Sequence, residues 1–215
     1  MSQNPDSPED KRKLRDEAAE KEASRELNDE SLALMELIKN GDEGAFQRLV
    51  ELHQGAVIGT VAKMLSSSSD AHDIAQMVFI RVWKSANRYR PEAKFTTWLF
   101  TITRNLVFNE MRRRKRRPES SLEEAEDDFH IGHADESHRQ PDAETLQTEL
   151  EKKIEEAIES LPEKQRTAVI LRRYENLPYE EIGKVLDMSL PAVKSLLFRA
   201  RGHLREKLLP YLESR

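Results

Sequence analysis

Two clusters of basic side chains contain the residues of this sequence that are best suited to a functional role. That role is to neutralise the negative charge of phosphate groups. The first cluster is MRRRKRR at 111–117, which places six basic side chains in seven positions. A helix macrodipole favours cations at a helix C-terminus, but six of them repel one another, which favours a polyanionic partner. The second cluster lies in DMSLPAVKSLLFRAR at 187–201, where Lys194, Arg199 and Arg201 lie on the part of a predicted helix that its apolar stripe leaves free. Both clusters predict contact with nucleic acid.

The second cluster belongs to a pattern typical of a helix-turn-helix. Pro178 opens a short predicted helix, Asp187 and Met188 form a turn, and Ser189 caps the next helix. Gly183 is small enough for the two helices to approach closely. Apolar residues form a continuous stripe on the second helix: Val193, Leu197, Ala200, Leu204 and Leu208. Such a helix fits the major groove of DNA, although an ordinary helical hairpin with solvated basic residues would show the same periodicity.

Upstream of the arginines, two further apolar stripes predict two helices. The stripes are Ile74, Val78 and Val82 on the first helix, and Phe95, Leu99, Ile102 and Leu106 on the second. Asp70 is placed to cap the first helix. The basic stretch NRYRPEAK at 87–94 joins them as a loop, and Tyr89 is suited to stack on an unpaired base, which returns about 1–3 kcal/mol. Trp83 and Trp98 are interpreted as core residues.

Composition excludes several classes of protein. The chain has 215 residues, a formal net charge of −5 and no cysteine, so disulfides, thiolate nucleophiles and cysteine–zinc sites are excluded. No apolar run approaches the ~18 residues of a membrane span. The N-terminal stretch has no apolar segment that would serve as a secretory signal. A cytoplasmic location is therefore expected.

Charge and periodicity divide the chain into four parts. Residues 1–30 are polar with mixed charge and are expected to form a disordered tail or a solvated helix. Helical periodicity covers 31–117 and returns at 150–213. Residues 118–149 carry eleven carboxylates against one arginine, Arg139, and are predicted to be a flexible linker. The predicted fold class is all-α, with two small helical domains joined by this acidic linker.

The C-terminal pattern resembles region four of bacterial sigma factors, specifically of the small extracytoplasmic-function (ECF) group. The matching residues are Glu181, Ile182, Val193, Lys194, Ser195, Leu197, Arg199, Ala200 and Arg201. The resemblance implies a helix-turn-helix that recognises the minus-thirty-five promoter element. Its DNA-binding residues are then Ala192, Lys194, Ser195, Phe198, Arg199 and Arg201. Three positions depart from the family: Pro191, Ala192 in place of threonine, which removes a hydroxyl contact, and Leu196 in place of arginine, which removes a long donor.

The stretch 70–117 resembles region two of the same family. The matching residues are Asp70, Asp73, Gln76, Phe79, Trp83, Pro91, Phe95, Trp98, Leu99, Ile102, Arg104 and Asn105. The resemblance implies that Asp73 and Gln76 bind the polymerase β′ clamp helices, with Met77 where glutamate is usual. The residues implied to bind the melted minus-ten element are Asn87, Arg88, Tyr89, Arg90, Lys94, Arg104, Asn105, Arg112, Arg113 and Arg116. Upstream, residues 31–65 resemble the start of region two. The predicted core residues there are Leu34, Leu37, Ile38, Phe46, Leu49 and Leu52.

Together the two resemblances imply an ECF-type sigma factor, an initiation subunit without catalytic activity, cofactor or metal. The implied partners are core RNA polymerase (through its β′ clamp helices and β flap), promoter DNA and an anti-sigma factor, with no membrane insertion. A helix-turn-helix repressor or activator that works without polymerase is the alternative. That alternative would use the C-terminal domain identically, but it leaves 70–117 without a role.

Two features point to other chemistry and are discounted. HIGH at 130–133 matches a nucleotide-binding signature of some aminoacyl-tRNA synthetases, but that motif needs a strand-to-helix turn and here lies in the acidic linker. His130, His133 and His138 could bind a divalent metal. Such a site is discounted because the stretch is predicted to lack ordered structure and supplies no thiolate ligand. The sequence shows no nucleophile with a positioned base and no glycine-rich phosphate loop, so it gives no indication of catalysis.

Overall fold

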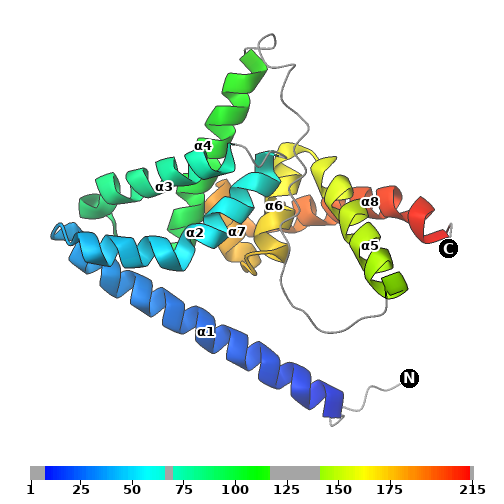
Figure 1. Cartoon of the computed structure of the whole chain (residues 1–215), viewed down its shortest axis with the longest axis horizontal. Coiled ribbons are helices and arrows are strands. Elements are labelled where there is room, and N and C mark those ends of the chain that lie inside the picture. The colour runs from blue at the N-terminus through cyan, green and yellow to red at the C-terminus, as the bar shows by residue number, and fades with distance from the viewer. Residues whose placement is uncertain (1–7, 66–69, 117–140, 214–215) are drawn as a thin grey trace.

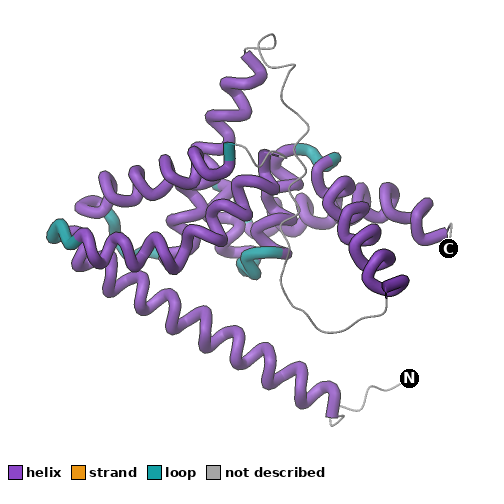
Figure 2. Tube along the Cα trace, viewed as in Figure 1, coloured by secondary structure: helices purple, strands orange, loops and turns teal. Residues whose placement is uncertain are grey.

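The computed structural model describes residues 8–65, 70–116 and 141–213, and within them every regular element is a helix (Figures 1 and 2). The elements are α1 (Pro8–Lys39), α2 (Glu43–Leu65), α3 (Ala71–Ser85), η1 (Ala86–Arg88), α4 (Phe95–Arg116), α5 (Pro141–Glu159), α6 (Glu163–Arg173), α7 (Tyr179–Leu186) and α8 (Leu190–Glu213). The all-α prediction is confirmed for these residues. Most of the predicted linker, with the motif at 130–133 and His138, lies outside them.

α1 is a long helix whose N-terminal turns extend past the other helices (Figure 1). Of the two alternatives stated for residues 1–30, residues 8–30 form the start of this helix. Near its C-terminal end Met35 and Ile38 are buried, whereas Leu37, which was predicted as core, is 49% exposed. Successive helical positions turn by about 100°. The face that holds Met35 and Ile38 therefore excludes Leu37.

α2, α3 and α4 complete an N-terminal helical group with a shared apolar core. Its fully buried members include Leu49, Val57, Val61, Ile74, Val78, Val82, Phe95 and Leu99. Asp70 occupies the N-cap position of α3, but its side chain makes no capping hydrogen bond and pairs with Arg114 of α4 instead. The predicted capping role is therefore wrong. A guanidinium is a stronger partner for a carboxylate than a backbone N–H is.

α5, α6, α7 and α8 form a C-terminal helical group, in which α5 begins at Pro141, within the stretch predicted as linker. The predicted turn between α7 and α8 is confirmed. Asp187 adopts a left-handed conformation with φ of 55°, and the Met188 N–H donates to the Gly183 carbonyl at 2.9 Å. A Cβ on Gly183 would lie 2.7 Å from the Met188 carbonyl oxygen, so this turn requires a glycine.

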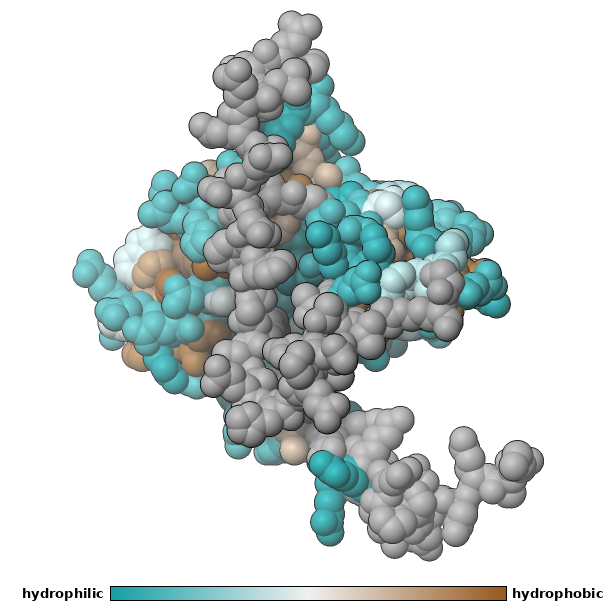
Figure 3. Space-filling view, turned by 45° about the vertical axis from the view of Figure 1, so that its right-hand side comes forward, coloured by the Kyte–Doolittle hydropathy of each residue, from teal (hydrophilic) through white to brown (hydrophobic). Residues whose placement is uncertain are grey.

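On the face shown in Figure 3 the described surface is mainly hydrophilic, and apolar side chains reach it in small patches. In the part of the chain that the structure describes, each helix is too short or too polar to cross a bilayer. Large exposed apolar side chains include Leu37, Met77, Ile80, Phe198, Leu209 and Leu212. Met77 lies beside the residues predicted to bind polymerase, and Phe198 is itself one of the residues predicted to bind DNA.

Candidate nucleic-acid interface

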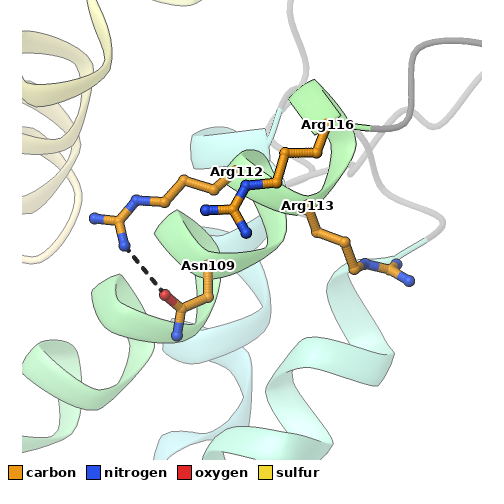
Figure 4. A pocket seen from close by; sticks show the side chains of 4 residues that line it. All are labelled: Asn109, Arg112, Arg113 and Arg116. Carbon is orange, nitrogen blue, oxygen red and sulfur yellow. Dashed lines mark hydrogen bonds between the residues drawn. The ribbon is translucent and has the colours of Figure 1, made fainter.

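Near the C-terminal end of α4 there is a hollow of about 360 Å³, which is lined by Asn109, Arg112, Arg113 and Arg116. Figure 4 shows Arg112 and Arg116 reaching to one side of the helix over Asn109, while Arg113 reaches to the other side. Arg113 is held by Glu110 at 2.7 Å, and this hydrogen bond lowers the pKa of the Glu110 carboxyl. Arg112 and Arg116 are exposed. They are therefore the cations of this helix end best placed to contact phosphates.

A second hollow, of about 270 Å³, lies beside the loop that joins η1 to α4. Its lining residues are Ser85, Arg88, Tyr89, Arg90, Glu92 and Trp98. The Tyr89 ring offers no open face to a base, because it is 3% exposed and its centroid lies 4.7 Å from that of Trp98. Trp98, which was predicted as core, packs against the core but is only half-buried, and its remaining surface lines the hollow. An indole among charged side chains is suited to stacking on a base.

Arg104, one of the predicted DNA-binding residues, is turned toward the C-terminal helical group. Its Nε and Nη2 both donate to the Val185 carbonyl oxygen, at 3.0 and 2.6 Å. Val185 lies in the last turn of α7, where carbonyls lack helical partners, so the guanidinium satisfies one of them. Burial lowers the pKa of Arg104. Arg104 cannot reach DNA while α4 and α7 stay packed, whereas Asn105 beside it is exposed.

Further polar contacts join the two helical groups. Thr60 of α2 donates to Glu175 Oε1 at 2.7 Å, and Thr97 of α4 donates to Glu181 of α7. These partners are 115 and 84 residues apart in the chain, so no local pattern could predict them. The two groups, which were expected on a flexible tether, are in direct contact in this structure.

Glu175 makes this contact depend on pH. Desolvation raises the pKa of its carboxyl, so the packed state takes up a proton more readily than the separated state does. The contact therefore weakens as pH rises from the ordinary pKa of a glutamate through the raised one. We expect Glu175→Gln, which keeps an acceptor for Thr60, to raise the thermal midpoint at about pH 7, with the gain shrinking toward about pH 5. A gain of equal size at both pH values would contradict this, and circular-dichroism melting measures it.

The outward face of α8 carries the residues predicted to bind the minus-thirty-five element. Lys194, Ser195, Phe198, Arg199 and Arg201 are exposed and Ala192 is half-buried. Phe198 is 74% exposed, an unusual position for a phenyl ring that has no partner surface. Leu196 is buried, because the core face of α8 is wide enough to include it beside Val193 and Ala200. Leu196 therefore contributes to the core of the C-terminal helical group, and that it removes a DNA-contacting donor stays a prediction.

The residues predicted to bind polymerase lie together on α3. Asp73 and Gln76 are exposed on the side of the helix that faces away from its core stripe. Met77 and Ile80 are exposed next to them and add apolar surface. Ile80 was not predicted to belong to this surface, although it follows Gln76 by four residues and residues at that spacing share a helix face. A mixed polar and apolar strip of this kind is typical of a protein–protein contact.

Two family models match the chain, one on each helical group. The family described as Sigma-70 region 2 matches residues 49–117, and the one described as Sigma-70, region 4 matches residues 151–204. The RNA polymerase sigma-H factor of Pseudomonas aeruginosa is 35% identical over 181 residues, which are 83% of this chain and 94% of that protein. The ECF RNA polymerase sigma-E factor of Haemophilus influenzae is 35% identical over 182 residues, which are 84% of this chain and 96% of that protein.

Solved structures share the fold. CnrH in complex with the cytosolic domain of CnrY matches with a TM-score of 0.61 at 21% identity, covering 83% of this chain and 97% of that one. The sigma factor RpoE in complex with the anti-sigma factor NepR from Bartonella quintana matches with a TM-score of 0.60 at 24% identity, covering 76% of this chain and 96% of that one. The arrangement of helices described above is therefore one that other chains adopt.

Proposed function

This chain belongs to the extracytoplasmic-function group of the sigma-70 family, and on that basis we propose that it recognises promoters at two separate sites. As a sigma factor it mediates promoter-specific transcription and is not an enzyme. One site reads the duplex minus-thirty-five element, and the other melts and captures the minus-ten element. A single observation carries the proposal: one chain presents a basic, groove-sized helix and, separately, a helix, α4, with an indole-lined hollow at its start and exposed arginines at its end.

In this proposal residues 31–117 act as region two and handle the melted strand. Arg112 and Arg116 neutralise its phosphates, and the hollow at Trp98 receives a base that has left the stack. Extrusion of a base costs a few kcal/mol, and stacking on an aromatic ring returns about 1–3 kcal/mol. Arg104 joins this surface only after α4 separates from α7, because in the packed form its guanidinium is held on the Val185 carbonyl through Nε and Nη2.

Residues 150–213 act as region four and bind the duplex. The N-terminal half of α8 enters the major groove, where Lys194 and Arg199 reach phosphates or base edges. Phe198 has no polar atom on its side chain to donate or accept a hydrogen bond. It is suited instead to the 5-methyl group of a thymine, which is the apolar feature of that groove.

We expect Phe198→Ala to lower affinity for minus-thirty-five duplex DNA by about five-fold, or about 1 kcal/mol. Replacing the contacted thymine by uracil removes its methyl group and should weaken the parent protein but not the variant. Fluorescence anisotropy with paired thymine and uracil duplexes measures both effects. Equal loss from uracil in the two proteins at every thymine position would rule out the methyl contact.

The exposed strip of α3 with Asp73 and Gln76 is proposed to dock on the β′ clamp helices of core polymerase, and the C-terminal helical group on the β flap. An anti-sigma factor is a further proposed partner. The solved RpoE of Bartonella quintana, which shares the fold, is bound to one. We place the protein in the bacterial cytoplasm, because core polymerase and promoters are found in that compartment.

Co-purification separates this proposal from a repressor or activator that acts without polymerase. A tagged full-length chain expressed in a bacterium is expected to retain the β and β′ subunits of core polymerase. The double variant Asp73→Ala, Gln76→Ala is expected to retain much less while binding duplex DNA normally. Retention of promoter DNA without any polymerase subunit would favour the alternative.

A further inference from the structure

The first turn of α4 is capped by a side chain from a distant helix. Lys94, the residue before α4, has no side-chain oxygen that could accept a hydrogen bond, so the N-cap position cannot supply a side-chain cap. The Phe95 N–H donates instead to Asn28 Oδ1 of α1, at 2.9 Å, across 67 residues of sequence. Phe95 is fully buried, so without this acceptor its N–H would be left with no hydrogen-bond partner away from water, which would destabilise the fold.

The part of α1 that carries Asn28 is itself fixed to the N-terminal helical group. Ser31 donates to the Leu27 carbonyl at 2.7 Å and lies 2.8 Å from His53 Nε2 of α2. Burial lowers the pKa of His53 to about 4, so the imidazole is neutral near pH 7. Because the Ser31 hydroxyl directs its one proton to Leu27, it accepts from the tautomer of His53 that is protonated at Nε2. The His53 ring also packs on Phe95, with centroids 4.9 Å apart. Asn28 is therefore presented from a rigid support.

α1 also contacts the loop that precedes α4 at two other points. The Lys39 ammonium lies 5.8 Å from the centroid of the Tyr89 ring, at the start of the loop. Lys94, at its end, donates to Ser24 Oγ at 3.4 Å. Of the three contacts, only the Asn28 hydrogen bond is made to the backbone of α4. Asn28 is therefore the direct link between α1 and the junction of loop and helix.

We propose that Asn28 is a positioning residue for the base-capture loop, residues 89–94. By holding the Phe95 N–H it fixes where the loop ends and α4 begins. It thereby fixes the distance between the hollow at Trp98 and the cations that flank it. The inference rests on the proposed capture of a minus-ten base by this loop, and it assigns that function a determinant outside the stretch 70–117.

The test uses the full-length chain with core polymerase and single-stranded minus-ten oligonucleotides, each with one abasic site in turn. In the parent protein one position should show a large loss of affinity when its base is removed, and this position marks the captured base. In Asn28→Ala we expect affinity for the intact strand to fall about five-fold, as for loss of a helix cap. We also expect the abasic penalty at that position to shrink by a similar factor.

Matched variants separate positioning from general damage. Asn28→Asp keeps an acceptor at the N-terminus of α4, where a negative charge is favourable, and should restore both affinity and abasic penalty. Asp29→Ala, an exposed neighbour on α1, should behave like the parent protein. Binding of minus-thirty-five duplex should be unchanged in all of them. An undiminished abasic penalty in Asn28→Ala, or no rescue by aspartate, overturns the inference. No abasic penalty anywhere in the parent protein overturns base capture itself.

Discussion

Replacing Arg112 and Arg116 together by alanine is expected to lower affinity for single-stranded minus-ten DNA by about 100-fold, since each charged contact with a phosphate is worth about 1.5 kcal/mol. Both side chains reach over the same side of α4, and both are exposed. The dependence of affinity on salt should change as well. The slope of log K against log salt should become shallower by about 1.4, which corresponds to two fewer released counterions on a single strand.

Arg113→Ala is the matched control for this pair. Arg113 lies on the same turn of α4 but is held by Glu110, and it reaches to the other side of the helix. Its removal should cost less than five-fold in strand affinity and should change the salt slope by much less than about 0.7, the effect of one lost phosphate contact on a single strand. Titrations at several salt concentrations measure both quantities. A loss for Arg113→Ala as large as that for the pair would contradict the assignment of phosphate contacts to one side of α4.

Gly183→Ala is expected to lower the free energy of unfolding of the C-terminal helical group by about 2 kcal/mol, the range of an overpacked core. Alanine normally stabilises an α-helix relative to glycine, by about 1 kcal/mol, so the expected sign depends on the turn. The new Cβ would lie 2.7 Å from the Met188 carbonyl oxygen, which is backbone and cannot rotate away. Displacing Met188 moves the start of α8, so binding of minus-thirty-five duplex should fall as well.

Gly202→Ala provides the opposite expectation on the neighbouring helix. A Cβ at Gly202 meets nothing within 4 Å, so only helix propensity changes, and stability should rise by about 0.5–1 kcal/mol. Urea unfolding of the two variants, followed by circular dichroism, measures the difference. If both substitutions stabilise the chain, the close crossing of α7 and the turn before α8 is not as described.

The parts of the fold that follow from local pattern could be predicted from the sequence. Val193 and Leu197 are buried on α8 because apolar residues at helical spacing share a face, and Asp187 and Met188 form the turn as predicted. The small size of Gly183 predicted a close approach, and the Met188 carbonyl packs against it. These features depend on residues within a few positions of one another.

The parts that depend on distant neighbours could not be predicted. Nothing near Arg104 in the sequence indicates that the Val185 carbonyl, 81 residues away, accepts its hydrogen bonds. Tyr89 was expected to face a base, but Phe95 and Trp98 surround its ring once α4 forms. The acceptor on Asn28 has the same character. The charges of the candidate site and its location in the chain could therefore be predicted from the sequence. The contacts that orient its side chains could not, because they depend on how distant helices pack.

The most direct test of promoter recognition is transcription in vitro by core RNA polymerase with and without the full-length chain, on a library of genomic fragments, with RNA 5′ ends mapped by sequencing. With the chain present, we predict discrete start sites whose upstream DNA shares two motifs, one near minus ten and one near minus thirty-five. The Asp73→Ala, Gln76→Ala variant should abolish them. Start sites that are the same with and without the chain would contradict the account.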